Sequence, residues 1–194
     1  MSRPVAPTEP AGKVAGPEDF QRILWRLAKE LQEHHPSGAG VTLCGIATRG
    51  IHLTERIRDL IEEQGGGRWE AVSLDVGPFR DDGPRSPVPA ALGAVLPVAE
   101  PATIHDRVVV LIDDVLYHGR TGRAALAALA ELGRPARVEL MVIVDRGHRE
   151  LPLRATYVGR NLPTSPDQRV WVHVRGCDDE DAIRLGDRPE GSAR

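Results

Sequence analysis

The sequence predicts an α/β protein with a mainly parallel central sheet and helices on both of its faces. Strand-like and helix-like segments alternate along the chain, which is typical of parallel strands joined by crossover helices. The central strand-like segments are apolar at nearly every position, as expected for strands that are covered on both faces. The length of 194 residues is sufficient for a substantial core.

The composition is that of a soluble globular protein, with 41% hydrophobic and 27% charged residues. The net charge of −3 gives no overall positive field, so any binding of nucleic acid would need local basic patches. No apolar segment approaches the ~20 residues that span a bilayer, and the N-terminus has no apolar signal-peptide core. We therefore expect a cytoplasmic protein without a membrane partner.

The N-terminal part of the chain begins with a proline-containing segment that lacks periodicity. It predicts a disordered tail at residues 1–15, ahead of a single domain at residues 16–194. The first helix begins at Pro17, a residue suited to a first helical turn, and its apolar side chains recur every three to four positions as far as Leu31. A short apolar strand is expected at 41–46.

The middle of the chain continues the alternation. Residues 51–63 predict a helix that ends at three consecutive glycines, and the alternating pattern at 69–76 predicts a strand. Residues 77–104 hold many of the prolines and form the longest stretch without clear periodicity.

The C-terminal part predicts the remaining elements. A continuous apolar strand at 107–112 is followed by an Ala/Leu-rich helix at 121–132, which Gly133 closes. A further apolar strand is expected at 137–144. An irregular stretch at 145–168 then leads to an alternating strand at 169–174.

Two adjacent carboxylates, Asp113 and Asp114, stand where the apolar strand 107–112 ends, which is where ligands bind in such sheets. Like charges are costly to place together unless sugar hydroxyls or a divalent cation compensate. The turn at 117–121 leads into a helix N-terminus, whose free N–H groups favour an anion. The pattern indicates a phosphorylated sugar, although a solvated turn with an N-cap also accounts for a lone Asp-Asp pair. Neither the P-loop nor the dinucleotide-binding glycine pattern is present.

Residues 108–121, Val-Val-Val-Leu-Ile-Asp-Asp-Val-Leu-Tyr-His-Gly-Arg-Thr, closely resemble the phosphoribosyl-pyrophosphate motif of type I phosphoribosyltransferases. The Val-Leu-Tyr and Gly-Arg-Thr elements are similar to the PyrR family. Residues 45–50, 145–152 and 161–165 resemble further blocks of that family. The resemblance covers residues 17–185 and implies the type I phosphoribosyltransferase fold, with a small hood region beside the parallel sheet.

The resemblance implies a uracil phosphoribosyltransferase that converts uracil and phosphoribosyl pyrophosphate into UMP and pyrophosphate with Mg²⁺. Arg49, Asp113 and Asp114 are the implied catalytic residues, and Mg²⁺ is held mainly through the substrate, with both aspartates as possible ligands. The family often has a non-proline cis peptide bond in the loop at residues 45–50. The residues implied to bind phosphoribosyl pyrophosphate or UMP are Thr48, Arg49, Gly50, Arg80, Asp113, Asp114, Val115, Leu116, Tyr117, His118, Gly119, Arg120, Thr121 and Arg146.

The segment around Arg80-Asp81-Asp82 matches the family's lid, which would exclude water from the reaction. A disordered surface loop is the alternative interpretation. The sequence departs from the family at two places. His118 replaces the usual threonine of the phosphate loop, and Gly83-Pro84-Arg85 replaces the lysine-containing part of the lid.

The family also regulates pyrimidine operons by binding messenger RNA in response to UMP and UTP. The candidates for RNA binding here are Arg22, Arg26, Lys29, His148, Arg149 and Arg154. A plain solvated helix face remains the alternative for the first three. Trp25 lies off the apolar stripe of its helix, and it is a candidate for base stacking or a partner contact.

Three rival functions remain open from the sequence. They are a non-catalytic, nucleotide-sensing RNA-binding regulator, a purine phosphoribosyltransferase, and a structural module without a ligand. The resemblance also implies a homodimer or a higher homo-oligomer.

Overall fold

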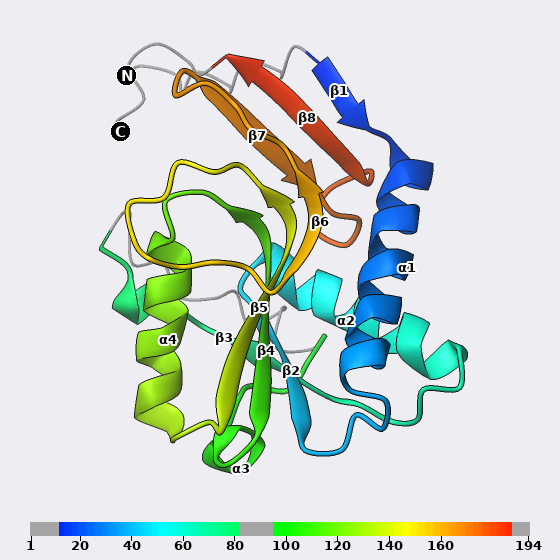
Figure 1. Cartoon of the computed structure of the whole chain (residues 1–194), viewed down its shortest axis with the longest axis vertical. Coiled ribbons are helices and arrows are strands. Elements are labelled where there is room, and N and C mark those ends of the chain that lie inside the picture. Colours follow the sequence, from blue (N-terminus) through cyan, green and yellow to red (C-terminus); the bar gives the residue numbers. More distant parts are fainter. Residues whose placement is uncertain (1–11, 82–94, 188–194) are drawn as a thin grey trace, which may run out of the picture.

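The computed structural model describes residues 12–81 and 95–187 (Figure 1). The elements in chain order are β1 (Gly12–Ala15), α1 (Pro17–His34), β2 (Val41–Ile46), α2 (Arg49–Glu63), β3 (Glu70–Leu74), the 3₁₀ turn η1 (Gly77–Phe79), α3 (Pro101–Ile104), β4 (Val108–Leu116), α4 (Arg120–Leu132), β5 (Arg137–Asp145), β6 (Tyr157–Asn161), β7 (Gln168–His173) and β8 (Ala182–Asp187).

The main sheet has five strands in the order β3-β2-β4-β5-β6, and all neighbouring pairs are parallel. Its faces are covered by different helices, with α1 and α2 on one side and α4 on the other (Figure 1). Side chains of β4 alternate between the two faces: Val110 and Ile112 pack in the cluster with α1 and α2, whereas Val109 and Leu111 pack in the cluster with α4. The predicted α/β class is confirmed.

A small antiparallel sheet in the order β1-β8-β7 lies beyond the carboxyl ends of the parallel strands (Figure 1). We call this sheet the hood. The predicted disordered tail is wrong for residues 12–15, which form β1 because they pair with the edge of β8. Residues 1–11 lie outside the described residues.

Several strand boundaries differ from the sequence prediction. β4 continues four residues beyond Ile112, because Asp113 and Leu116 still pair with Val142 and Asp145 of β5. The expected irregular segments contain β6 and the short helix α3, and β8 was not predicted. Asp113 and Asp114 therefore lie within the last four residues of the paired strand β4, and not after its end.

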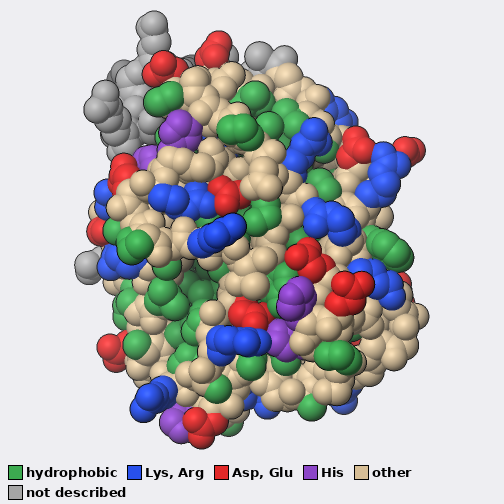
Figure 2. Space-filling view, in the orientation of Figure 1, with side chains coloured by type: hydrophobic (Ala, Val, Ile, Leu, Met, Phe, Trp, Pro, Cys, Tyr) green, Lys and Arg blue, Asp and Glu red, His purple; other side chains and the backbone are tan. Residues whose placement is uncertain are grey.

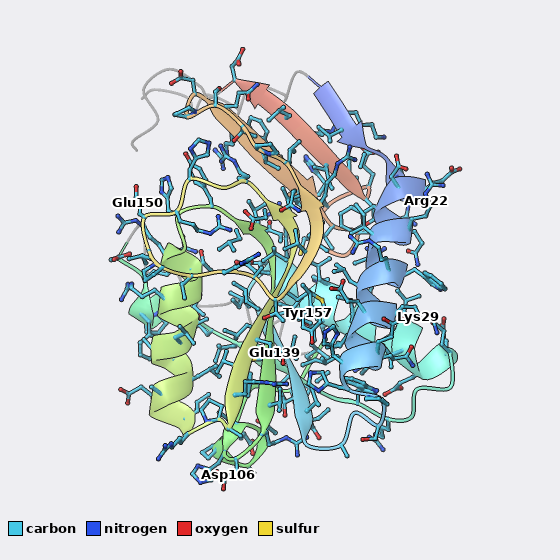
Figure 3. All side chains as sticks on the ribbon, viewed as in Figure 1. Arg22, Lys29, Asp106, Glu139, Glu150 and Tyr157 are labelled. Carbon is cyan, nitrogen blue, oxygen red and sulfur yellow. The ribbon has the colours of Figure 1, made fainter. Side chains whose placement is uncertain are left out.

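Helix α1 is fastened to the far edge of the main sheet by polar contacts. Arg26 donates to the Val158 carbonyl at 3.0 Å and also to the Gly159 carbonyl. Glu139 is buried between β5 and α1, where it accepts hydrogen bonds from Tyr157 at 2.7 Å and from His35 at 3.0 Å (Figure 3). Burial opposes the ionisation of Glu139, but these hydrogen bonds outweigh it and lower its pKa. Within the described ranges, no helix has the length and apolar character needed to cross a bilayer.

Candidate functional site

Asp113 and Asp114 form the acidic part of the site near the carboxyl end of β4. An oxygen of Asp113 accepts the Asp114 amide at 2.9 Å, and an oxygen of Asp114 accepts the Val115 amide at 2.7 Å. Burial, and then the negative charge of Asp114, raise the pKa of Asp113 well above its ordinary value. Burial also raises the pKa of Asp114, although the nearby Arg49 guanidinium opposes that rise. Two carboxylates held this close favour hydroxyl donors or a cation between them.

The loop at residues 117–121 lies beside these carboxylates, at the start of α4. Gly119 has a φ of 93° and is the N-cap of α4, a left-handed conformation that favours glycine. The first amides of α4 therefore open toward a cavity of about 320 Å³. The lining of this cavity includes Arg80, Asp113, Val115, Leu116, Tyr117, His118, Gly119, Arg120 and Thr121. One hollow thus brings together most of the residues predicted to bind phosphoribosyl pyrophosphate.

Arg149 supports this loop from behind. Its guanidinium donates to the carbonyls of Tyr117 at 2.8 Å, Gly147 at 2.9 Å and Leu153 at 3.0 Å, and it pairs with Asp145. A side chain with this many internal partners is poorly placed to contact RNA. The structure therefore argues against Arg149 as an RNA contact and places it as a support of the phosphate loop.

Arg49 lies at the first turn of α2, where it faces the hood. Its guanidinium binds Asp178 through two hydrogen bonds of 3.0 and 2.9 Å, and this pairing raises the pKa of Arg49. Burial opposes the ionisation of Asp178, but the hydrogen bonds from Arg49 and from the Val174 amide, together with the charge of Arg49, outweigh it and lower the pKa of Asp178. Asp178 thus holds the guanidinium near Asp114, in a geometry that also suits two phosphate oxygens.

The turn before α2 is compact, as the motif at residues 45–50 predicts. The Ala47–Thr48 peptide bond is cis, as is common in the family that this motif resembles. A Cβ atom on Gly50 would lie 2.3 Å from the Ile112 carbonyl oxygen, so only glycine permits this approach to β4. Thr48 is exposed at the start of α2. The close packing fixes Arg49 beside the carboxyl end of β4.

Arg146 directly follows β5 and lies beside Tyr117 of the loop. It is buried, and its guanidinium stands over the Tyr117 ring at 3.9 Å from the ring centre. It donates to the Gln168 carbonyl at 2.6 Å and to the Thr164 hydroxyl at 3.1 Å. His148 Nε2 donates to the Thr164 carbonyl, and the ring meets the Tyr117 ring edge-on. Arg146 and His148 therefore order the wall of the site.

Several residues of the site were missed from the sequence. Asp178 lies in an acidic run near the end of the chain, and no local pattern links that run to Arg49. Glu150 belongs to a block whose resemblance was noticed, but no role was assigned to it. Arg169 of β7 lines the cavity as well. Asp178 and Glu150 come from segments distant in sequence from Arg49 and His118, the residues they contact.

A larger hollow of about 820 Å³ lies elsewhere, beside Trp69 and the start of β3. It contains none of the predicted site residues, and it is at the amino end of the sheet. Ligands of open α/β sheets bind at the carboxyl ends of the strands. We therefore assign the site to the smaller cavity.

The acidic pair fits Mg²⁺ only in part. Among the described residues, no group of three or more His, Cys, Asp or Glu side chains is arranged to hold a metal ion. Asp113 and Asp114 supply at most two carboxylates. This donor set suits an ion that takes most of its ligands from substrate oxygens and water, as Mg²⁺ usually does.

The residues predicted to bind RNA are dispersed. Arg22 and Lys29 point outward from α1 (Figure 3), and Arg22 pairs with Asp19 at 2.5 Å. Arg26 is partly engaged by β6, as described above, whereas Arg154 is exposed on the other side of the site. On the face drawn in Figure 2, basic and acidic side chains are interspersed.

The segment predicted as a lid, Asp82-Gly83-Pro84-Arg85, lies outside the described residues. Arg120 and Arg123 pair with Asp81, the residue just before it.

The fold and the site define a phosphoribosyltransferase. Residues 18–180 match the phosphoribosyl transferase domain family. The hypoxanthine phosphoribosyltransferase of Trypanosoma cruzi superposes with a TM-score of 0.68 at 13% identity, over 92% of this chain and 97% of that one. A Staphylococcus aureus hypoxanthine phosphoribosyltransferase superposes with a TM-score of 0.67 at 18% identity, over 93% of this chain and 94% of that one. At these identities the likeness is one of fold alone.

Closer similarity in sequence is found among proteins named bifunctional protein PyrR. The one from Chloroflexus aurantiacus is 44% identical over 172 residues, which cover 88% of this chain and 92% of that protein. The one from Streptomyces coelicolor is 45% identical over 171 residues, covering 88% and 87%. The chain belongs to the PyrR family of phosphoribosyltransferases, and the family expected from its sequence motifs is confirmed.

Proposed function

We propose that this protein transfers the phosphoribosyl group of phosphoribosyl pyrophosphate to uracil, giving UMP and pyrophosphate. One observation carries the proposal: Asp113 and the loop at 117–121 line the same cavity near the carboxyl end of β4, and Asp114 directly follows Asp113 in that strand. Carboxylates suit the ribose hydroxyls, and the N-terminal amides of α4 suit the 5′-phosphate.

The reaction forms a bond between a uracil nitrogen and ribose C1 and breaks the bond from C1 to pyrophosphate. The uracil nitrogen loses its proton, and pyrophosphate leaves with the bonding electron pair. Positive charge develops on the ribose as that bond breaks, and Asp113 and Asp114 lie where they stabilise it. Arg49 exchanges Asp178 for the pyrophosphate oxygens. When bound, Mg²⁺ neutralises charge on the leaving pyrophosphate.

The choice of uracil over a purine is testable by competition. The structural neighbours that use purines share only the fold with this chain, whereas the PyrR relatives are similar over most of its length. We expect UMP to form from uracil and phosphoribosyl pyrophosphate with Mg²⁺, and a tenfold excess of hypoxanthine to leave the rate nearly unchanged. Product identification by chromatography is the measurement. Formation of IMP instead of UMP would favour the purine alternative, and UMP binding without turnover would favour a non-catalytic regulator.

We further propose that the protein binds a messenger RNA leader in a manner that depends on UMP or UTP. The support is the PyrR relationship and the outward-facing basic side chains of α1, beside the exposed Trp25. Lys29 lies 5.8 Å from the centre of the Trp25 ring, so the two side chains form a basic and aromatic pair suited to an unpaired base. We also expect the protein to work in the cytoplasm as a homodimer or larger homo-oligomer, as the resemblance implies.

Charge reversal on α1 tests this part of the proposal. The double variant Arg22→Glu/Lys29→Glu should weaken binding of an RNA copy of a pyrimidine-gene leader by at least about tenfold, and it should reduce the salt dependence of binding. Arg134→Glu, an exposed site between α4 and β5, is the matched control and should have little effect. Filter retention with and without UMP is the measurement. Wild-type protein that retains no RNA under either condition would contradict the proposal.

A further inference from the structure

His118 introduces a titratable group into the phosphate loop. Its ring stacks on Tyr117 at 3.7 Å between ring centres, and it lines the same cavity as Gly119 and Thr121. The side chain is 23% exposed, so it is accessible from the cavity but held by its neighbours. A threonine or other hydroxyl at this position would offer a hydrogen bond at every pH, whereas an imidazole gains a charge when it is protonated.

The carboxylate of Glu150 lies beside His118 and Arg120 of this loop. One oxygen lies 3.5 Å from Nδ1 of His118, and the other accepts from Arg120 at 2.6 and 3.1 Å. The position is fixed by the backbone, because the amides of Glu150 and Leu151 both donate to the His118 carbonyl at 3.1 Å. Figure 3 shows Glu150 on the loop above α4. A single carboxylate thus contacts the two side chains that flank Gly119.

We propose that His118 is a proton-dependent ligand for the 5′-phosphate, which its imidazolium contacts in exchange for Glu150 when a nucleotide binds. Nucleotide affinity then falls as the pH rises through the range in which imidazole loses its proton. This inference rests on the proposed function, because it assumes that the loop at 117–121 receives the phosphate of UMP or phosphoribosyl pyrophosphate.

The direction of the effect follows from the charges around the ring. Imidazole ordinarily titrates near pH ~6.5, and a phosphate that carries up to two negative charges stabilises imidazolium more than one carboxylate does. By linkage, the nucleotide binds more tightly to the protonated form, and the advantage is lost as the pH rises. Among the described residues, the other charged or titratable groups near the loop fall into three sets. Tyr117 and Arg120 belong to the loop itself, with Asp81 paired to Arg120. Arg146, His148 and Arg149 lie behind Tyr117, and Arg80, Asp113 and Arg169 line the same cavity. The arginines keep their charge throughout this pH range.

The test compares UMP binding by wild type and His118→Thr between pH 6 and pH 8, measured by titration calorimetry. The phosphate of UMP titrates in the same range, but its contribution cancels in the ratio of the two affinities. We expect the wild-type advantage over His118→Thr to shrink by about tenfold from pH 6 to pH 8, as a charged hydrogen bond is replaced by a neutral one. Thermal unfolding of each variant checks that the loop's host structure is intact.

Glu150→Gln provides a second readout. The amide keeps the shape of the side chain but competes less with phosphate for Arg120 and His118. We expect UMP to bind several-fold more tightly to Glu150→Gln at each pH, since charge-assisted hydrogen bonds are about twice as strong as neutral ones. Weaker binding by this variant would overturn the exchange of Glu150 for phosphate.

The outcomes separate this inference from the function on which it rests. If wild type and His118→Thr bind UMP with parallel pH profiles, the inference is wrong and the proposed function stands. If folded wild-type protein binds no UMP at any pH, the proposed function fails, and the inference fails with it.

Discussion

At the scale of single residues, Asp113 and Asp114 serve the proposed reaction, but their burial side by side lowers the stability of the fold. Burial and mutual repulsion raise the pKa of Asp113, and burial raises that of Asp114. A carboxyl whose pKa is raised by folding stabilises the protein only while it is protonated, and this contribution is lost as the pH rises through the raised pKa. At neutral pH the pair therefore lowers the stability of the fold.

Replacement of one carboxylate should consequently stabilise the fold while removing function. Asp113→Asn keeps an oxygen that can accept the Asp114 amide but removes the repulsion between the pair. We expect the free energy of unfolding at pH 7 to rise by about 1 kcal/mol, which raises Tm by about 2–4 °C for a chain of this size. Because the protonated wild type lacks the repulsion too, the difference should shrink as the pH is lowered.

The measurement is thermal unfolding at several pH values. Asp167→Asn, at an exposed position before β7, is the matched control and should change Tm little at any pH. A lower Tm for Asp113→Asn at pH 7 would mean that hydrogen bonds to the carboxylate outweigh its burial.

Residues of the site differ in how well the sequence predicts them. The sequence identified Asp113, Asp114 and Gly119, because they lie close together along one strand, turn and helix. Their relative positions therefore follow from a local sequence pattern. Asp178 and Glu150 were not identified, because their contacts with Arg49 and His118 join segments that are 129 and 32 residues apart in the chain. Nothing in a local pattern specifies such a contact.

At the scale of elements, two arginines of α2 connect the hood to the main body. Arg49 and Arg56 lie two turns apart on one face of the helix, and they bind Asp178 and Asp181 of the turn between β7 and β8. The two pairs differ in exposure, since Asp181 is buried whereas the Arg49 side chain is 39% exposed. We infer that the Arg56–Asp181 pair holds the hood in place and leaves Arg49 free to exchange partners.

Removal of the buried acid tests that assignment. Asp181 accepts two hydrogen bonds from Arg56, at 2.7 and 3.0 Å, and one from the Arg175 amide at 2.9 Å. Asp181→Ala removes the acceptor of these three hydrogen bonds and should lower the free energy of unfolding by about 3 kcal/mol. Denaturant unfolding is the measurement. The exposed neighbour Asp179 is the control, and Asp179→Ala should stay within about 0.5 kcal/mol of wild type. Equal effects of the two substitutions would contradict the assignment.

The elements of the main sheet were easier to predict than those of the hood. Strands buried on both faces are continuous apolar runs, so β2, β4 and β5 were evident from composition alone. β1 has only four residues, and half of its positions are exposed. It is a strand because β8 offers it an edge, and this depends on the tertiary fold.

At the scale of the whole molecule, the chain places a rigid sheet beneath a hood, and the proposed reaction lies between them. Arg49 comes from α2, the acidic pair from β4, the phosphate loop from the start of α4, and Arg146 from the end of β5. Because the strands are parallel, these segments all lie at the carboxyl end of the sheet. The sequence predicted this arrangement because the alternation of strands and helices, together with the order of the motifs, leaves few topologies open.

The measurement that tests the central claim most directly is uracil-dependent release of pyrophosphate from phosphoribosyl pyrophosphate with Mg²⁺, in wild type and in Asp114→Asn. We expect turnover by wild type, and a loss of at least about a hundredfold in the variant, which should be at least as stable as wild type. Wild-type protein that is folded and binds UMP but releases no pyrophosphate would contradict the account, and so would an Asp114→Asn variant with undiminished turnover.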